Sequence, residues 1–255
     1  MSQFEYTMGK EVDLKAEEAR TLATPKLPAN LMLKFMFWQF DVLYGKARSL
    51  PKVLVLEILA RYPYWAWENG SYHYLSKLYS GTKKVSAEKV ETALRHIQMG
   101  RESQDNEQWH MLLWADLCHQ LGIKLCWVRH FVMPKTMTFV YFLITRVMYW
   151  LNPVWSFAMN AAFESHAEHE YMLYAKEHPE FETTPVDSPW FKYYPQQKSL
   201  AVPIPINQSE AEIGAAKTTI PEKKCIVLAD LVRRVGLDER DHMNHSLEEI
   251  ERLAK

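Results

Sequence analysis

Two short segments of the sequence each place a glutamate three residues before a histidine, namely Glu107 with His110 and Glu239 with His242. Residues three apart lie on the same face of an α-helix, so each pair could offer a carboxylate and an imidazole to one ion. Two such pairs, with one further carboxylate from each of two other helices, form the ligand set of a di-iron or di-manganese helical bundle. A single Glu-x-x-His pair often arises by chance, so it is the presence of two that favours a metal centre.

Two glutamates in apolar segments are the candidates for the further carboxylates. Glu57 is the only charged residue between Val53 and Ala60, and Glu164 directly follows the apolar residues 161–163. An isolated buried carboxylate is costly unless it is protonated, paired or bound to a metal. Glu57 could instead be paired with a buried Arg or Lys. Glu168, one helical turn after Glu164, is a rival ligand.

Four carboxylates and two imidazoles form an oxygen-rich site suited to two iron or manganese ions, whereas zinc favours tetrahedral Cys and His sites. Two reduced irons with open positions could bind O2 and supply electrons to it. The polar residues Asn106 and Asp238, each directly before a candidate ligand, could orient the ligand set. Tyr171 lies two turns after Glu164 on the same face. It could act beside the metals as a redox-active or hydrogen-bonding group, or simply be part of the core.

The elements that must position these residues are predicted to be helices, because the 255-residue chain has only 8 glycines and its long segments show helical periodicity. Residues 1–28 are predicted to be a mobile polar arm, followed by a single domain over 29–255. Residues 178–224 are rich in proline and are predicted to be a long irregular excursion. The predicted helices cover about 29–44, 51–78, 86–122, 134–152, 153 to at least 171, and 222–252.

Two aromatic-rich apolar segments bear on whether the protein associates with a membrane. They are residues 31–44 and 137–159. Each could form a core helix or lie in a membrane interface, where Trp and Tyr favour the boundary between lipid and water. Arg146 and the pair Asn152-Pro153 interrupt the second segment, whereas a spanning helix needs about 20 apolar residues without such breaks. We therefore expect a helix partly sunk into one leaflet, with Arg146 reaching the headgroups, and a peripheral, monotopic protein. A buried soluble hairpin is the alternative.

Composition excludes some classes of protein. The net charge is −1 and the sequence pI is about 6.8, so no basic field indicates nucleic acid as a partner. The three cysteines have neither disulfide-framework nor zinc-type spacing and are expected to be reduced thiols. No secretory apolar region is evident at the N-terminus, which is also too acidic for an organellar transit peptide.

The order and spacing of these motifs resemble the alternative oxidase family, the di-iron quinol oxidases of mitochondria, plastids and some bacteria. The resemblance covers about residues 30–250. It rests on Leu56-Glu57 followed by Pro63, on Asn106-Glu107-x-x-His110, on Glu164 with Tyr171 seven later, and on Asp238-Glu239-x-x-His242.

The resemblance implies a ferritin-like four-helix bundle that holds two Fe ions, with manganese less favoured, and two additional membrane-interface helices. It implies a homodimer that oxidises a quinol and reduces O2 to water without pumping protons. The implied metal ligands are Glu57, Glu107, His110, Glu164, Glu239 and His242. Tyr171 occupies the position of the catalytic tyrosine. The implied quinol pocket involves Leu56, Ala167, Lys52, His166 and Glu170.

The residues around Glu164 depart from the pattern of the mitochondrial alternative oxidases, and these differences indicate which branch of the family the chain resembles. Glu164-x-His166-Ala167 is similar to the plastid terminal oxidases, as are Pro63-Tyr64 and Lys192-Tyr193-Tyr194. That branch oxidises plastoquinol, on a thylakoid-type membrane; a bacterial protein would use the cytoplasmic side, and ubiquinol stays open as the substrate. Glu170 replaces a small residue beside the tyrosine, and the stretch between Glu57 and Glu107 is long for either branch.

Three other functions remain open. One is a divergent di-iron oxygenase or desaturase-type enzyme acting on another lipophilic substrate, which Glu170 and the long 57–107 stretch motivate. Another is a non-catalytic iron-binding or storage bundle. The last is a metal-free interfacial scaffold in which the Glu-x-x-His pairs are only surface polar pairs.

Overall fold

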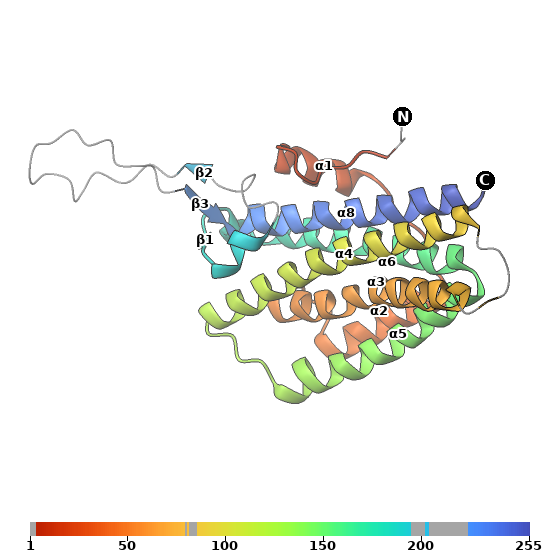
Figure 1. Ribbon diagram of the computed structural model, residues 1–255. Helices are drawn as coiled ribbons and strands as arrows, with labels where there is room; N and C mark the ends of the chain where they lie inside the picture. The colour runs from red at the N-terminus through yellow and green to blue at the C-terminus, as the bar shows by residue number, and fades with distance from the viewer. Residues whose placement is uncertain (1–3, 80, 82–85, 195–201, 204–223) are drawn as a thin grey trace, which may run out of the picture.

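The computed structural model describes residues 4–79, 81, 86–194, 202–203 and 224–255. The described chain is a bundle of long helices with a small sheet at one end (Figure 1), so the predicted all-α fold is confirmed. The helices are α1 (Leu14–Ala23), α2 (Leu31–Tyr44), α3 (Leu50–Tyr79), α4 (Ala87–Gln120), α5 (Met133–Leu151), α6 (Pro153–Glu177) and α8 (Leu228–Leu253).

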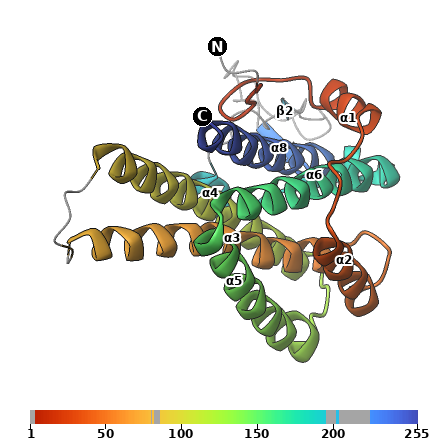
Figure 2. The same cartoon turned by 90° about the vertical axis from the view of Figure 1, so that its right-hand side faces the viewer.

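Four of these helices form the central bundle. Helix α3 packs along α4, α6 packs along α8, and α4 also contacts α8. Helix α5 lies against α3 and α6 on one side of the bundle, next to α2 (Figures 1 and 2). The far ends of α3 and α4 extend together beyond the other helices (Figure 2).

Local sequence signals set several helix boundaries. The Asn30 side chain accepts a hydrogen bond from the Leu33 backbone N–H and caps α2. Asn152 caps α6 in the same way, and Pro153 supplies the first residue of that helix, where its missing N–H costs no hydrogen bond. Helix α4 ends just before Gly122, which adopts the left-handed conformation (φ 64°) that favours glycine.

The main core lies between α4, α6 and α8. Leu113 and Trp114 of α4 meet Tyr171 of α6 and Val232 of α8, and all four are fully buried. The rings of Trp114 and Tyr171 stack with centroids 5.9 Å apart. A second apolar cluster joins α2, α3, α5 and α6; its buried members are Leu33, Ala60, Tyr141, Met159, Ala162 and Phe163. This cluster attaches α2 and α5 to the bundle.

The outer faces of α2 and α5 are exposed and apolar. Leu31 and Trp38 of α2 are 85% and 60% exposed, and Phe139 and Trp150 of α5 are 61% and 70% exposed. Among the described residues, one helical stretch, Val128–Leu151, is long and apolar enough to cross a membrane by length and composition. Only 22% of its most apolar part is buried, so the described chain leaves most of this apolar surface uncovered.

The structure corrects the prediction for residues 1–28. Residues 14–23 form helix α1, which packs against α6 and α8. Asp13 caps this helix, and Glu17 forms an ion pair with Arg240 of α8. Where the sequence predicted a mobile arm, the structure therefore has a packed helix whose polar residues form ion pairs with the bundle.

The Pro-rich excursion is also more regular than predicted. It contains the short helices η2 (Pro179–Glu182) and η3 (Pro189–Tyr193) and strands β1 (Pro185–Val186) and β2 (Val202–Pro203). Strand β3 (Lys224–Val227) lies between β1 and β2 and pairs antiparallel with both. The last helix therefore begins at Leu228 and not near Glu222. Residues 195–201 and 204–223 of the excursion lie outside the described residues.

Candidate metal centre

All six predicted ligands point into the interior of the bundle. Helix α3 contributes Glu57, α4 contributes Glu107 and His110, α6 contributes Glu164, and α8 contributes Glu239 and His242. Each is at most 1% exposed. The Glu-x-x-His spacing works as expected, because both members of each pair reach the same centre from one helix face.

The six residues form two overlapping groups of possible ligands. One group is Glu57, Glu107, His110 and Glu239, and the other is Glu107, Glu164, Glu239 and His242. Within each group, one ligand atom from every residue lies within 4.8 Å of the others. Glu107 and Glu239 belong to both groups. This arrangement suits two cations, each with its own imidazole and its own carboxylate, and two carboxylates between them.

Hydrogen bonding within the protein leaves the centre of this cluster unsatisfied. The following buried atoms form no hydrogen bond of good geometry in the described structure: both carboxylate oxygens of Glu107 and of Glu239, Oε2 of Glu57 and of Glu164, Nδ1 of His110, and both ring nitrogens of His242. His242 Nδ1 nevertheless lies 2.8 Å from Oε1 of Glu107. Buried polar atoms of this kind are costly and rare in proteins. Bound cations would satisfy them, and the mixture of carboxylate and imidazole fits iron or manganese.

Electrostatics support the same conclusion. Burial, followed by the Glu107 carboxylate, raises the pKa of Glu57 well above its ordinary value, and burial with the Glu239 carboxylate raises the pKa of Glu164. Burial opposes charge on His110 and His242, but the surrounding carboxylates outweigh it and raise the pKa of both imidazoles. Without cations, the cluster must hold protons to offset its negative charge. Metal ions would replace those protons.

Asp238 fixes the orientation of His110. Its carboxylate accepts a hydrogen bond from His110 Nε2 at 3.1 Å, which leaves Nδ1 facing Glu57 at 3.4 Å and Glu239 at 3.5 Å. Arg234 forms an ion pair with Asp238 at 3.1 Å, and Asn106 donates a weaker bond to it at 3.4 Å. The predicted positions of Asn106 and Asp238 beside the ligands thus match the structure. Carboxylates that hold a ligating histidine in this way tune its basicity.

Two buried tyrosines, named above only for their similarity to the plastid branch, also contact residues of this site. Tyr194, at the end of η3, donates a hydrogen bond to Asp238 at 2.6 Å. Tyr64 of α3 donates to Glu164 at 2.5 Å and receives a bond from Asn160. Tyr64 lies two turns after Glu57 on the same helix, so its spacing was a usable signal. Tyr194 is brought in only by the fold of the excursion.

Tyr171 lies at the centre of the bundle, as predicted. It is fully buried, and its hydroxyl donates a hydrogen bond to Oε1 of Glu57. The stacked Trp114 ring holds the phenol in place. The hydroxyl is therefore in direct contact with one of the candidate ligands, where it could give or take a proton.

The rival carboxylate Glu168 lies outside the cluster. It accepts hydrogen bonds from Arg240 and from the Thr21 hydroxyl, both at 2.7 Å. Its charge is thus offset by an arginine, whereas Glu164 has no cationic side chain beside it other than His242 among the residues that the structure describes. Glu168 therefore joins α6 to α1 and α8, whereas Glu164, one helical turn earlier, is part of the buried cluster.

A cavity of about 200 Å³ lies between α2, α3 and α6. Four of the five predicted substrate-binding residues line it: Leu56, Lys52, His166 and Glu170. The fifth, Ala167, is buried but does not line this cavity. Leu56 directly precedes Glu57, so the cavity reaches the neighbourhood of the cluster.

Charged side chains close one side of this cavity. Glu170 forms ion pairs with Lys26 at 2.8 Å and with Arg48 at 2.9 Å. The His166 ring stacks on Phe37 of α2 with centroids 4.0 Å apart, and burial followed by the Lys26 charge lowers the pKa of His166 to about 4. Glu170, which departs from the family pattern, is therefore held in place from two sides.

Comparison with known proteins agrees with this geometry. Residues 7–249 match the family described as alternative oxidase. A comparison with curated protein sequences gave no significant match. The matched region contains all the helices that supply the six ligands and Tyr171, and the family is one of membrane-associated, di-iron oxidoreductases. With most of its length matched and its buried Glu and His cluster assembled on four helices, this chain belongs to the alternative oxidase family.

Proposed function

We propose that this protein is a membrane-associated di-iron quinol oxidase that couples quinol oxidation to the reduction of O2 to water without pumping protons. The observation that carries the proposal is the pair of ligand groups that share Glu107 and Glu239 in a fully buried site. The preferred quinol is plastoquinol, with ubiquinol as the other candidate, and the expected assembly is a homodimer.

In this proposal Glu57, Glu107, His110, Glu164, Glu239 and His242 hold two irons. The irons would supply the O2-binding positions and the electrons that pass to oxygen. The surrounding chain excludes water, since each ligand is buried, and Asp238 keeps His110 turned toward the centre. Tyr171 is the proposed catalytic residue, because its hydroxyl can exchange a proton with Glu57.

The cavity beside Leu56 is the proposed quinol site. Phe37 and Phe40 of α2 form part of its wall, and the outer face of the same helix is exposed and apolar. A lipophilic quinol leaving a bilayer would therefore meet α2 first. Lys52, His166 and Glu170 on the cavity wall offer polar atoms to a quinol hydroxyl.

The test is an oxygen-electrode assay of iron-loaded protein with short-chain plastoquinol and ubiquinol analogues. We expect steady O2 consumption, with two quinols oxidised per O2 and no hydrogen peroxide released. A protein that carries two irons per chain but consumes no O2 with either quinol would contradict the proposal. Catalase addition provides the control, because it returns O2 only if peroxide is formed.

A related function is the second candidate: the same chemistry on another lipophilic substrate. It is motivated by Glu170, whose carboxylate and paired Arg48 place two charges on the cavity wall. Such an enzyme would consume O2 only when that substrate and a separate reductant are both supplied. Activity with quinol alone therefore separates the two candidates.

A further inference from the structure

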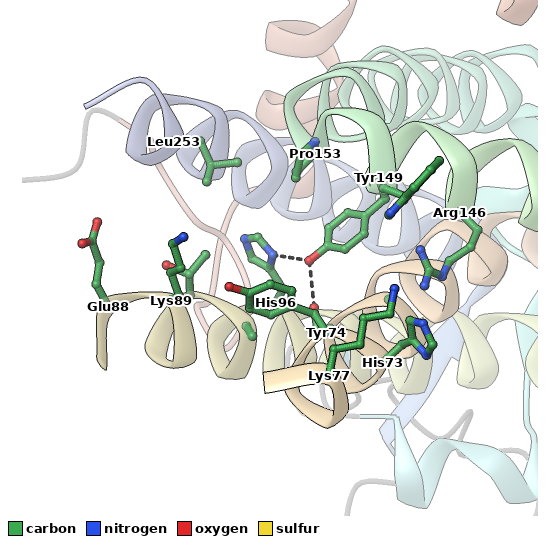
Figure 3. A pocket seen from close by; sticks show the side chains of 15 residues that line it. His73, Tyr74, Lys77, Glu88, Lys89, His96, Arg146, Tyr149, Pro153 and Leu253 are labelled. Carbon is green, nitrogen blue, oxygen red and sulfur yellow. Dashed lines mark hydrogen bonds between the residues drawn. The ribbon is translucent and has the colours of Figure 1, made fainter. Parts of the chain in front are cut away.

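A larger cavity lies at the opposite end of the bundle from the excursion. Its volume is about 410 Å³, within the range of small-molecule sites. The C-terminal ends of α3, α5 and α8 and the N-terminal ends of α4 and α6 surround it (Figure 3). None of the six candidate ligands lines it, nor does any residue that lines the cavity beside Leu56. It is built where α3 and α4 extend beyond the other helices, within the unusually long 57–107 stretch.

The inner wall of this cavity is apolar and well ordered. The Tyr149 ring forms part of the wall, and its hydroxyl is hydrogen-bonded to Ser71 at 2.8 Å and to His96 at 2.6 Å. Gly70 makes room for that ring, because a Cβ at this position would lie 2.7 Å from it. Ala93 closes the wall on the α4 side.

Basic side chains gather at one end of the cavity. Figure 3 shows Lys77, His73 and Arg146 together there, away from Glu88. A smaller adjoining cavity of about 240 Å³ is lined by the same three residues. Arg146 donates a hydrogen bond to the neutral Asn69 side chain at 3.3 Å, and no carboxylate of the described residues lies within ion-pair distance of it. The Arg146 charge is therefore open to an anionic ligand.

The basic end opens onto the exposed apolar face of α5. Trp150 lines both cavities and Val147 lines the smaller one, and these side chains are 70% and 52% exposed. A ligand with its anionic group beside Arg146 could place apolar chains inward against Tyr149 and outward along α5. A small hydrophilic anion would leave this apolar surface uncovered.

We propose that these joined cavities form a specific site for an anionic lipid, with its headgroup between His73, Lys77 and Arg146. Charge complementarity selects the headgroup, since the larger cavity is lined by two lysines and one arginine against one glutamate. The site is separate from the proposed quinol cavity, so the proposal does not depend on quinol oxidation. Lipid binding at this site also differs from general attraction of a basic surface to an anionic membrane, because it depends on the residues of one pocket.

The test uses full-length protein and dihexanoyl phosphatidylglycerol below its micelle concentration, with binding measured by isothermal titration calorimetry. We expect one lipid per chain, and weaker binding of dihexanoyl phosphatidylcholine and of inorganic phosphate. Arg146→Gln and Lys77→Gln should each weaken phosphatidylglycerol binding about tenfold, the effect of one lost charged hydrogen bond. Thr92→Trp, which fills the cavity without changing charge, should weaken it as well.

The matched control is Lys135→Gln, which removes one exposed positive charge from the other end of α5. It should leave binding of the short-chain lipid unchanged. Equal losses in Lys135→Gln and Arg146→Gln would show attraction by surface charge and overturn the proposal. Phosphate binding as tight as lipid binding would assign the site to a free anion, and absence of lipid binding to the unmodified protein would also overturn it. Iron content and thermal unfolding of each variant show whether it is folded.

Discussion

Glu164 and Glu168 lie one turn apart on α6 in opposite environments. Glu164 faces the cluster of buried ligands, whereas Glu168 is held by Arg240 and Thr21. We predict that Glu164→Gln lowers iron binding from two ions to one or fewer per chain, because the amide carries no charge to hold a cation. Glu168→Gln should keep both irons and lose about 1–3 kcal/mol of stability through the weakened bond to Arg240.

Iron content by inductively coupled plasma mass spectrometry and stability by denaturant unfolding test this pair. The two variants make the same chemical change on the same helix, so each controls for the other. Full iron occupancy in Glu164→Gln would show that the ligand assignment is wrong. Iron loss in Glu168→Gln instead would reinstate the rival ligand.

Tyr171 allows a second test at the level of single residues. Tyr171→Phe removes the hydroxyl that contacts Glu57 but keeps the ring that stacks on Trp114. We expect normal iron content and a turnover at least about 100-fold lower, the range of a lost proton-transfer group. Tyr174→Phe, on the same helix and also buried, should retain activity. Equal activity in the two variants would reduce Tyr171 to a core residue.

Sequence was informative about ligands and less so about their partners. The six residues that meet in the cluster are identifiable because two local spacings and two isolated glutamates mark them. Tyr194 could not be identified, since it reaches Asp238 from 44 positions away through a segment without periodicity. Arg234 could have been noticed, because it precedes Asp238 by one helical turn.

At the scale of elements, α1 was missed for a physical reason. A search for apolar periodicity finds helices that bury an apolar face, but α1 is held by charge. Glu17 pairs with Arg240, and Glu18 pairs with Arg233, both from α8. The basic partners lie more than 200 positions away in the sequence, so α1 reads locally as a polar arm. Strand β3 was missed because its partners are two-residue strands.

The contact between α4 and α8 predicts a pH dependence. Burial raises the pKa of Glu249, but hydrogen bonds from His96 and Arg95 outweigh burial and lower it to about 2. Its folded pKa thus lies below its ordinary value of 4.5. The stabilisation is fully present above about pH 4.5 and is lost as the pH falls through about 2.

We therefore expect Glu249→Gln to lower the melting temperature at pH 7 by about 5 °C. The difference from the unmodified protein should shrink steadily below pH 4.5. Thermal unfolding followed by circular dichroism at a series of pH values measures it. Glu102→Gln, at an exposed position on α4, is the control and should change little. A deficit that stays constant down to pH 2 would rule out the carboxylate charge as its cause.

For the whole molecule, the exposed apolar faces of α2 and α5 predict how it meets a bilayer. Trp38→Glu and Phe139→Glu should each weaken binding to liposomes about tenfold, because burying one large apolar side chain is worth about 1.5–3 kcal/mol. Leu94→Glu changes an equally apolar residue on α4 that is 52% exposed and should not weaken binding. Liposome co-sedimentation measures all three. Similar losses in all three variants would contradict a defined membrane face.

The order of the long helices was predictable, since each has its own apolar pattern and end signals. The sequence could not predict whether an apolar helix faces protein or solvent, because core and membrane-interface helices have the same composition. Arg146 illustrates this limit. The sequence predicted that it reaches headgroups, but not that it contacts Asn69 of α3 at the mouth of a cavity. Only the packing of α5 on α3 reveals that neighbour.

The sharing of Glu107 and Glu239 between the two ligand groups has a consequence for metal loading. A single ion would offset part of the negative charge of both groups but leave the remaining carboxylates buried with protons. A second ion would then enter a site in which Glu107 and Glu239, which belong to both groups, are already ordered. The two halves are therefore thermodynamically coupled, and half-loaded molecules should be scarce beside empty and full ones. If the cluster holds two irons as proposed, we therefore expect iron loading to be cooperative.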